Sequence, residues 1–207
     1  MSSWQDRFKR GLDLVGAGCG LLAAAPVIGV AALLIRHEDG GSALFRQARV
    51  GLDGRSFDVL KLRTMIVGAE QKGAGYAVAA GDARITRIGD LLRRTSIDEL
   101  PQFWNVLRGD MSLVGPRPTL AYQVERYSER QRRRLEVRPG LTGWAQVHGR
   151  ASLPWAERIE LDVWYVEHRT LRLDLEIMLR TVGIIFSGSG TYKGPAGGWT
   201  PPDGSGA

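Results

Sequence analysis

Two adjacent carboxylates stand close to paired arginines in the segment Arg93-Arg-Thr-Ser-Ile-Asp-Glu-Leu-Pro101. Within helices proline fits only the first turn, so Pro101 predicts a helix that starts here, with Asp98 at or beside the N-cap and Glu99 in the first turn. The free backbone N–H groups of that turn, together with one of the two arginines, would form an anion site. Such a site keeps Asp98 ionised, as a nucleophile requires, and two carboxylates beside phosphates suit Mg²⁺.

The same residues also fit ordinary helix capping. Ser96 with Glu99 matches a capping box, and Asp98 is a good cap by itself. Capping needs no ligand, so this segment alone leaves a structural and a catalytic interpretation open.

A second segment, Gly109-Asp-Met-Ser-Leu-Val-Gly-Pro-Arg-Pro118, holds one arginine between two prolines. The prolines fix the backbone on both sides of Arg117 and hold its guanidinium in place, which suits a phosphate or pyrophosphate. An ordinary proline turn is the alternative. Further along, His148 ends a turn-rich loop and, taken alone, is more typical of a structural histidine than of a base.

The composition limits the partners and the kinds of site. The 207 residues include 28 Lys+Arg and 22 Asp+Glu, a net charge of +6, which permits nucleic acid, an anionic membrane surface or a nucleotide substrate. Arginine makes up 24 of the 28 basic residues, which fits anionic partners as well as a genome that prefers arginine. The single cysteine, Cys19, excludes a disulfide framework and the common cysteine-rich zinc sites.

The element that would hold these residues at a membrane is an apolar N-terminal run. Residues 14–35 carry no charge and, at about 1.5 Å per residue, are long enough to cross a hydrocarbon core of about 30 Å. Pro26 interrupts the run near its middle, and basic residues flank both ends, among them Lys9, Arg10 and Arg36. We therefore expect a helix-break-helix that enters and leaves the membrane on its cytoplasmic face, with a spanning helix as the alternative.

Asp13 stands at the edge of the apolar run, three and four residues after Arg10 and Lys9 on the same helical face. These charges would reach back to charged groups of the rest of the chain only if both ends of the run lie on one side of the membrane.

The remaining sequence predicts an α/β fold that is mostly α with a small β element. Residues 45–63 predict two short strands around a glycine-containing turn, and helical patterns occupy 88–94, 99–107, 122–136, 153–166 and 173–186. Trp155, Trp164 and Tyr165 suit helices that lie in a headgroup layer. Residues 66–81 predict a mobile loop. The expected domains are a membrane anchor at 1–36, a catalytic domain at 37–186 and a disordered tail at 187–207.

Six motifs follow one another between Lys9 and about Thr181: Lys9-Arg10 with Asp13; Phe45-Arg-Gln47 with Arg49 and Gly51; Lys61-Leu-Arg-Thr-Met65; Ser96-Ile-Asp-Glu-Leu-Pro-Gln102; residues 105–118; and Pro139-Gly-Leu-Thr-Gly-Trp-Ala-Gln-Val147. In these motifs the chain resembles the monotopic phosphoglycosyl transferases, the bacterial sugar transferase family that begins polyprenyl-linked glycan assembly. Where that family usually has Asn the chain has His148, and where it often has Ser before the helix-breaking proline the chain has Ala25.

This resemblance implies transfer of sugar-1-phosphate from a UDP-sugar to polyprenyl (undecaprenyl) phosphate, with release of UMP. It further implies the first membrane step of exopolysaccharide, O-antigen or glycoprotein glycan synthesis, on the cytoplasmic face of the inner membrane. Asp98 matches the aspartate that forms a covalent phosphosugar intermediate, and Glu99 matches its neighbour near Mg²⁺ and the acceptor phosphate. The charged positions around the phosphates match Lys61, Arg93, Arg117 and, as a further acidic position, Asp174.

Two other functions remain as alternatives. A membrane-anchored module that binds nucleic acid or anionic lipid would use the basic run 132–134, and a metal-dependent phosphodiesterase would hydrolyse the same nucleotide sugars. The transferase explains the carboxylate pair better, so no nucleic-acid partner is expected. The sequence names neither the sugar, nor the loop residues that contact it, nor the glycan pathway. It does not fix the oligomeric state either, and a homo-oligomer is compatible with it.

Overall fold

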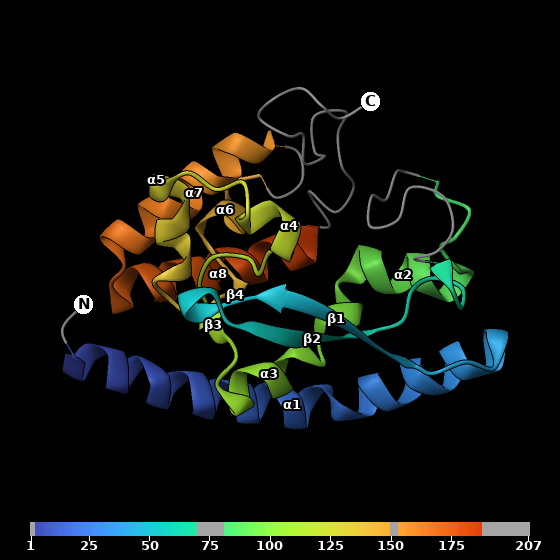
Figure 1. The fold of residues 1–207 in the computed structure, drawn as a ribbon. Coiled ribbons are helices and arrows are strands. Elements are labelled where there is room, and N and C mark those ends of the chain that lie inside the picture. Colours follow the sequence, from blue (N-terminus) through green and yellow to red (C-terminus); the bar gives the residue numbers. More distant parts are fainter. Residues whose placement is uncertain (1–2, 70–80, 150–152, 188–207) are drawn as a thin grey trace.

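The computed structural model describes residues 3–69, 81–149 and 153–187. Most of the predicted mobile loop at 66–81, and all of the predicted tail after residue 187, lie outside these residues. The described part is mostly helical, as predicted, and has two small sheets (Figure 1). Its elements are α1 (Ser3–Asp39), β1 (Leu44–Val50), η1 (Leu52–Gly54), β2 (Ser56–Leu62), α2 (Arg87–Thr95), η3 (Ile97–Glu99), α3 (Gln102–Arg108), β3 (Ser112–Val114), α4 (Ala121–Val124), α5 (Glu129–Arg132), η4 (Arg133–Leu135), β4 (Gly140–Thr142), α6 (Trp144–Val147), α7 (Trp155–His168) and α8 (Leu171–Ser187).

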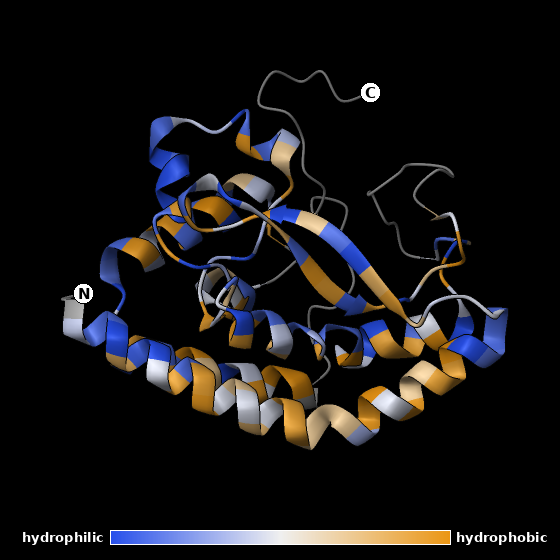
Figure 2. Cartoon of the chain, turned by 60° about the horizontal axis from the view of Figure 1, so that its bottom comes forward, coloured by the Kyte–Doolittle hydropathy of each residue, from blue (hydrophilic) through white to orange (hydrophobic). Residues whose placement is uncertain are grey.

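The N-terminal apolar run forms one helix, α1, and the predicted break at Pro26 is wrong. Pro26 lies inside a continuous helix because it removes one backbone hydrogen bond while the helical bonding resumes on both sides. Figures 1 and 2 show that the helix is bowed instead, with both ends turned toward the rest of the chain. Residues 4–39 are long and apolar enough to cross a membrane by length and composition.

One face of α1 packs on the domain through small residues. A Cβ on Gly16 would stand 2.7 Å from Leu113, and a Cβ on Gly20 would stand 2.8 Å from the ring of Phe103, so both positions need a glycine or a shift of the neighbour. Ala17 is fully buried between them. The large apolar side chains point away from this contact and are exposed, including Trp4, Phe8, Val15, Leu22 and Leu33.

The predicted strand pair is confirmed and forms an antiparallel hairpin. Leu44 of β1 lies opposite Leu62 of β2, and the register continues to Val50 opposite Ser56. The intervening turn has a left-handed backbone at Asp53, with φ of 54°, and at Gly54, with φ of 76°. This hairpin places Lys61 near the end of β2.

The sequence did not predict the second sheet, which is the parallel pair β3 and β4. Each strand has three residues, too few for an alternating pattern to show. The backbones come so close that a Cβ on Gly140 would stand 2.1 Å from the nitrogen of Gly115. This contact fixes the start of the segment that carries Arg117.

The predicted helix at 122–136 is wrong, because the chain there divides into α4, α5 and η4. Ser128 begins a new helix: its hydroxyl accepts from the backbone N–H of Gln131, whose side chain accepts from the N–H of Ser128. Tyr127, just before it, turns inward and is buried. A capping box inside an amphipathic pattern therefore ended one helix and started another.

Candidate active site

Asp98 and Glu99 lie in the 3-10 turn η3, between α2 and α3, and not at the start of a longer helix. Ser96 has a left-handed backbone, with φ of 58°, and turns the chain from α2 into η3. Its side chain makes no capping hydrogen bond there, and Pro101 is the N-cap of α3. The Ser96–Glu99 capping box and the placement of Asp98 beside a helix N-cap are therefore both wrong, and the capping interpretation loses its support.

Glu99 is the acceptor that joins two distant basic residues. Its Oε1 accepts from Lys61 Nζ at 2.9 Å and from Arg117 Nη2 at 2.6 Å. Burial alone would raise the pKa of Glu99, but the charges of Arg117 and Lys61 outweigh it and lower that pKa well below its usual range. Glu99 is therefore ionised, and it holds both cations in place.

Asp98, by contrast, is buried without a hydrogen bond to any residue that the structure describes. It is 8% exposed. Burial and the charge of Glu99 raise the pKa of Asp98 to about 6, against the opposing charges of Lys61, Arg93 and Arg117. The charged form of Asp98 is thus less stabilised than that of Glu99. A carboxylate of this kind suits a nucleophile, which must donate an electron pair to an electrophile.

The structure brings five of the predicted site residues together around this turn. Arg93, on α2, donates from Nε to Thr64 Oγ1 at 2.9 Å, so it reaches Asp98 by charge rather than by a hydrogen bond. Lys61 comes from β2 and Arg117 from the proline-bounded segment. The site is therefore built from four separate parts of the chain.

Asn105 is a structural residue of this site to which the sequence assigned no role. It is fully buried in α3. Its side-chain amide donates to the carbonyl of Asp58 at 2.7 Å and accepts from the N–H of Leu60 at 3.0 Å, as a neighbouring strand would. Asn105 thereby ties α3 to the strand that carries Lys61. An asparagine in an otherwise helical pattern was the available signal.

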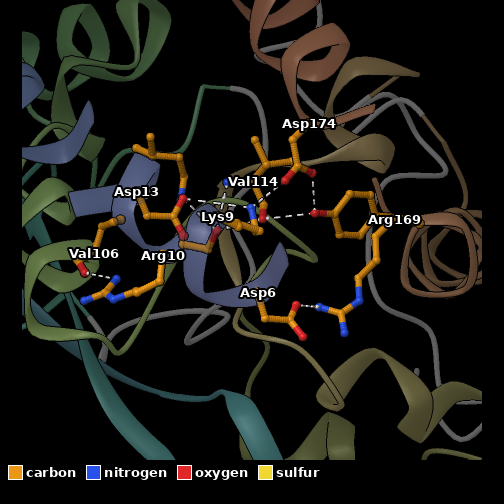
Figure 3. Close-up of polar contacts among 11 residues, drawn as sticks. Asp6, Lys9, Arg10, Asp13, Val106, Val114, Arg169 and Asp174 are labelled. Atoms are coloured by element: carbon orange, nitrogen blue, oxygen red, sulfur yellow. Dashed lines mark hydrogen bonds and ion pairs between the residues drawn. The ribbon is translucent and has the colours of Figure 1, made fainter. Parts of the chain in front are cut away.

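Asp174 lies in a different cluster, which Figure 3 shows. Its two oxygens accept from Lys9 Nζ at 2.7 Å and from the hydroxyl of Tyr165 at 2.6 Å. No described contact joins Asp174 to Asp98, Glu99 or their cations. Its role in substrate binding stays a prediction from the family resemblance.

Arg10 and Asp13, which the sequence analysis also singled out, hold the first turns of α1 to the domain (Figure 3). Arg10 donates to the carbonyls of Val106 at 2.8 Å and Leu107 at 3.1 Å, the last turn of α3. Asp13 Oδ1 accepts from the hydroxyl of Ser112 and from the N–H of Leu113.

The far end of α1 contacts the same domain. Glu38 accepts from the N–H of Arg87 at 2.9 Å, and Asp39 pairs with Arg63. Both ends of the apolar helix are thus tied to one folded body.

The carboxylates of the site suit a hard divalent cation. Within the described ranges no group of three or more His, Cys, Asp or Glu residues could hold an ion. Glu99 Oε1 already accepts hydrogen bonds from two cations. At most two carboxylate groups are therefore available to a metal ion, that of Asp98 and that of Glu99 through its second oxygen. This set fits Mg²⁺, which takes one or two carboxylates and completes its shell with phosphates and water.

Known proteins resemble this chain along nearly its whole length. The family model described as "Bacterial sugar transferase" matches residues 4–188. The UDP-glucose:undecaprenyl-phosphate glucose-1-phosphate transferase of Caulobacter vibrioides is 47% identical over 196 residues, which cover 90% of this chain and 73% of that protein. The uncharacterized sugar transferase EpsL of Bacillus subtilis is 43% identical over 185 residues, which cover 89% of this chain and 90% of that protein.

Other relatives are much longer than this chain. The UDP-N-acetylgalactosamine-undecaprenyl-phosphate N-acetylgalactosaminephosphotransferase of Aeromonas hydrophila is 43% identical over 188 residues, which cover 88% of this chain but 44% of that protein. The chain thus spans nearly all of some relatives and less than half of others.

Proposed function

This chain belongs to the bacterial sugar transferase family, and on that premise we propose that it transfers sugar-1-phosphate from a UDP-sugar to undecaprenyl phosphate in polysaccharide synthesis. The observation that carries the proposal is the buried Asp98, which has no hydrogen bond to any described residue and lies among Lys61, Arg93 and Arg117. The names of the Caulobacter and Aeromonas relatives support the substrate class.

The proposed reaction has two steps. A carboxylate oxygen of Asp98 attacks the phosphorus that bears the sugar, and the bond from that phosphorus to the bridging oxygen breaks, so UMP leaves with the electron pair. A phosphate oxygen of undecaprenyl phosphate then attacks the same phosphorus and releases the carboxylate of Asp98. Covalent catalysis thereby splits one difficult transfer into two easier ones.

The neighbouring residues offset charge during both steps. Lys61 and Arg117, held by Glu99, face the same turn as Asp98 and would bind the non-bridging oxygens of the diphosphate. Pro116 and Pro118 restrict the backbone on both sides of Arg117, so its guanidinium is positioned before substrate arrives.

We propose Mg²⁺ as the cofactor, held by Asp98 and Glu99, where it would offset charge on the substrate phosphates. Removal of divalent cations with a chelator, followed by dialysis, should abolish turnover, and added Mg²⁺ should restore it. Full turnover in excess chelator would contradict the proposal.

The decisive experiment measures UMP release by the purified chain in nanodiscs, with a panel of UDP-sugars. With undecaprenyl phosphate present, UMP should form continuously from the correct UDP-sugar. Without it, release should stop near one UMP per enzyme and leave labelled sugar phosphate on the protein. Continuous release without the acceptor would identify a hydrolase instead.

The basic run at 132–134 offers little to a nucleic-acid partner. Arg134 is buried against Asp162, and Arg133 pairs with Glu167, so two of its three charges are already neutralised by α7. This geometry supports the transferase over the binding module.

We propose that α1 enters and leaves the cytoplasmic membrane on its cytoplasmic face. Two observations support this: both ends of α1 are tied to the same domain, and α8 also exposes an apolar stripe at Leu175, Leu179 and Val182. A cysteine at Ser3, in a Cys19→Ala background, should react with impermeant thiol reagents only after cells are opened. Labelling of intact spheroplasts would show that the N-terminus crosses the membrane.

A further inference from the structure

A buried arginine stands directly behind the proline-bounded segment of the site. Arg134, in η4, is 7% exposed. Its guanidinium donates to three groups from three parts of the chain: the hydroxyl of Tyr127, Asp162 Oδ2 on α7, and the backbone carbonyl of Arg117 at 2.9 Å. Two nitrogens in one fixed plane, Nη1 and Nη2, serve the three groups, whereas a lysine has its donors on a single nitrogen.

This network is not arranged for greatest stability. Asp162 Oδ1 is buried with no hydrogen-bond partner in the part of the chain that the structure describes. Burial raises the pKa of Asp162 to about 6, in spite of the charge of Arg134. Well-packed apolar residues often replace such buried pairs without loss of stability, so stability alone does not account for this pair.

The contact with the Arg117 carbonyl suggests that role. The two prolines have no N–H to donate, so the segment is held largely through its carbonyl oxygens. The carbonyl of Pro116 accepts from the N–H of Gly140 at 2.8 Å, and that of Pro118 accepts from Arg49 at 3.4 Å. The bond from Arg134 holds the middle residue, whose side chain reaches Glu99.

We propose that Arg134 is a positioning residue for the transfer, an inference that rests on the proposed function. Held by Asp162 and Tyr127, it fixes the backbone of Arg117, so that the Arg117 side chain stays on Glu99 and its charge stays near Asp98. Arg134 touches no reacting atom and acts through Arg117.

Arg134→Lys is the first test, because it keeps the charge and removes the fork. Arg133→Lys is the matched control: Arg133 is adjacent and also pairs with α7, through Glu167, but it has no contact with the Arg117 segment. With the UDP-sugar selected by the panel, Arg134→Lys should lower kcat about 10- to 100-fold, since small misplacements of positioned groups cost this much. Arg133→Lys should lower it less than twofold.

A double-mutant cycle separates positioning from a loss of stability alone. Arg117→Gln removes the side chain that Arg134 is proposed to position. In that background Arg134→Lys should lower kcat no further, because the group it positions is already absent. A kcat loss of the same size in both backgrounds would show that Arg134 acts independently of Arg117.

If Arg134→Lys does not fold, Tyr127→Phe removes one partner of Arg134 and should lower kcat by a smaller factor. Guanidinium ¹⁵N NMR, with the Arg117 resonance assigned from Arg117→Gln, follows the Arg117 side chain without turnover. That resonance should move in Arg134→Lys and stay in place in Arg133→Lys, and this result is readable even if the wild type is inactive, an outcome that would contradict the proposed function alone. A lower Tm with an unchanged kcat and an unchanged Arg117 resonance would overturn the inference.

Discussion

Two clusters of carboxylates and cations, each assembled from distant parts of the chain, differ in how completely their charges are paired. In the dyad cluster of Asp98, Glu99, Lys61 and Arg117, Glu99 takes both hydrogen bonds and Asp98 takes none from the described residues. In the anchor cluster of Lys9, Asp13, Asp174 and Tyr165, both oxygens of Asp174 accept a hydrogen bond. The fully hydrogen-bonded Asp174 serves to hold α1 to α8, whereas the carboxylate of Asp98, without hydrogen bonds, is available to act as a nucleophile.

Replacement of the unpaired carboxylate should have the largest effect. Asp98→Asn keeps the size of the side chain but removes the nucleophile, so turnover should fall at least about 1,000-fold and no phosphosugar adduct should form. Exchange of labelled UMP into the UDP-sugar measures the first step alone. Exchange at the wild-type rate would show that Asp98 is not the nucleophile.

Replacement of a carboxylate in the anchor cluster should lower the stability of the fold instead of the rate of turnover. Asp174→Asn leaves the largely buried Lys9 with only the more distant Asp13, at 3.9 Å, as a charged partner, so the free energy of unfolding should fall by about 3 kcal/mol. Asp6→Asn is the control, since its pair with Arg169 is more exposed and should contribute less than about 1 kcal/mol. Thermal unfolding in nanodiscs measures both. An unchanged Tm with a raised KM for the UDP-sugar would favour the substrate-binding role that the family resemblance implies for Asp174.

Asp98→Asn should also stabilise the fold at neutral pH. The folded-state pKa of Asp98 is about 6, above the ordinary 3.8, so its contribution to stability is complete below about pH 3.8 and is lost as pH rises through 6. The amide has no charge to bury, and the variant should exceed wild type by up to about 3 kcal/mol at pH 7.5. Unfolding at pH 7.5 and at pH 4 checks the sign, because the advantage should shrink toward pH 4. An equal or lower Tm at pH 7.5 would contradict the cost assigned to the buried charge.

The smallest effect tests how the cations control Asp98. Activity should decline as pH falls through about 6, where Asp98 takes up a proton. Lys61→Met removes a charge that lowers this pKa, so the acid limb of kcat/KM should move up by roughly one pH unit or less. Lys61→Arg restores the charge and should bring the limb back toward the wild-type position. If the acid limb of kcat/KM stays in place in both variants, a group other than Asp98 controls the pH profile.

Much of the fold was predictable because it rests on local patterns. The hairpin around Gly54 and the two long C-terminal helices, α7 and α8, follow from alternation and from helical periodicity. The three-residue strands β3 and β4 show no such pattern, and their pairing depends on the close approach at Gly115 and Gly140. The division at Ser128 depends on one capping box.

The site was predictable in its members but not in its geometry. Residue types pointed to Asp98, Glu99 and Arg117, and the family resemblance added Lys61 and Arg93. The fold brings these five candidates together. Only the folded chain shows that Glu99 takes the hydrogen bonds, because Lys61 is 38 residues away in sequence. The same holds for Asp174, since no local pattern places it beside Lys9 and away from the carboxylate pair.

The joint between Lys9 and Asp174 also sets an order of events during synthesis. The two residues are 165 positions apart, so a ribosome that adds about 5–20 residues per second needs roughly 10–30 s to make the second after the first. During that interval the first helix has emerged, and the opposite charges near Lys9 are its helix neighbours Asp6, three residues before it, and Asp13, four residues after it. The apolar helix is therefore synthesised first, and the Lys9–Asp174 ion pair that holds it to the domain forms last. A nascent chain that stops before α8 carries the helix without this ion pair.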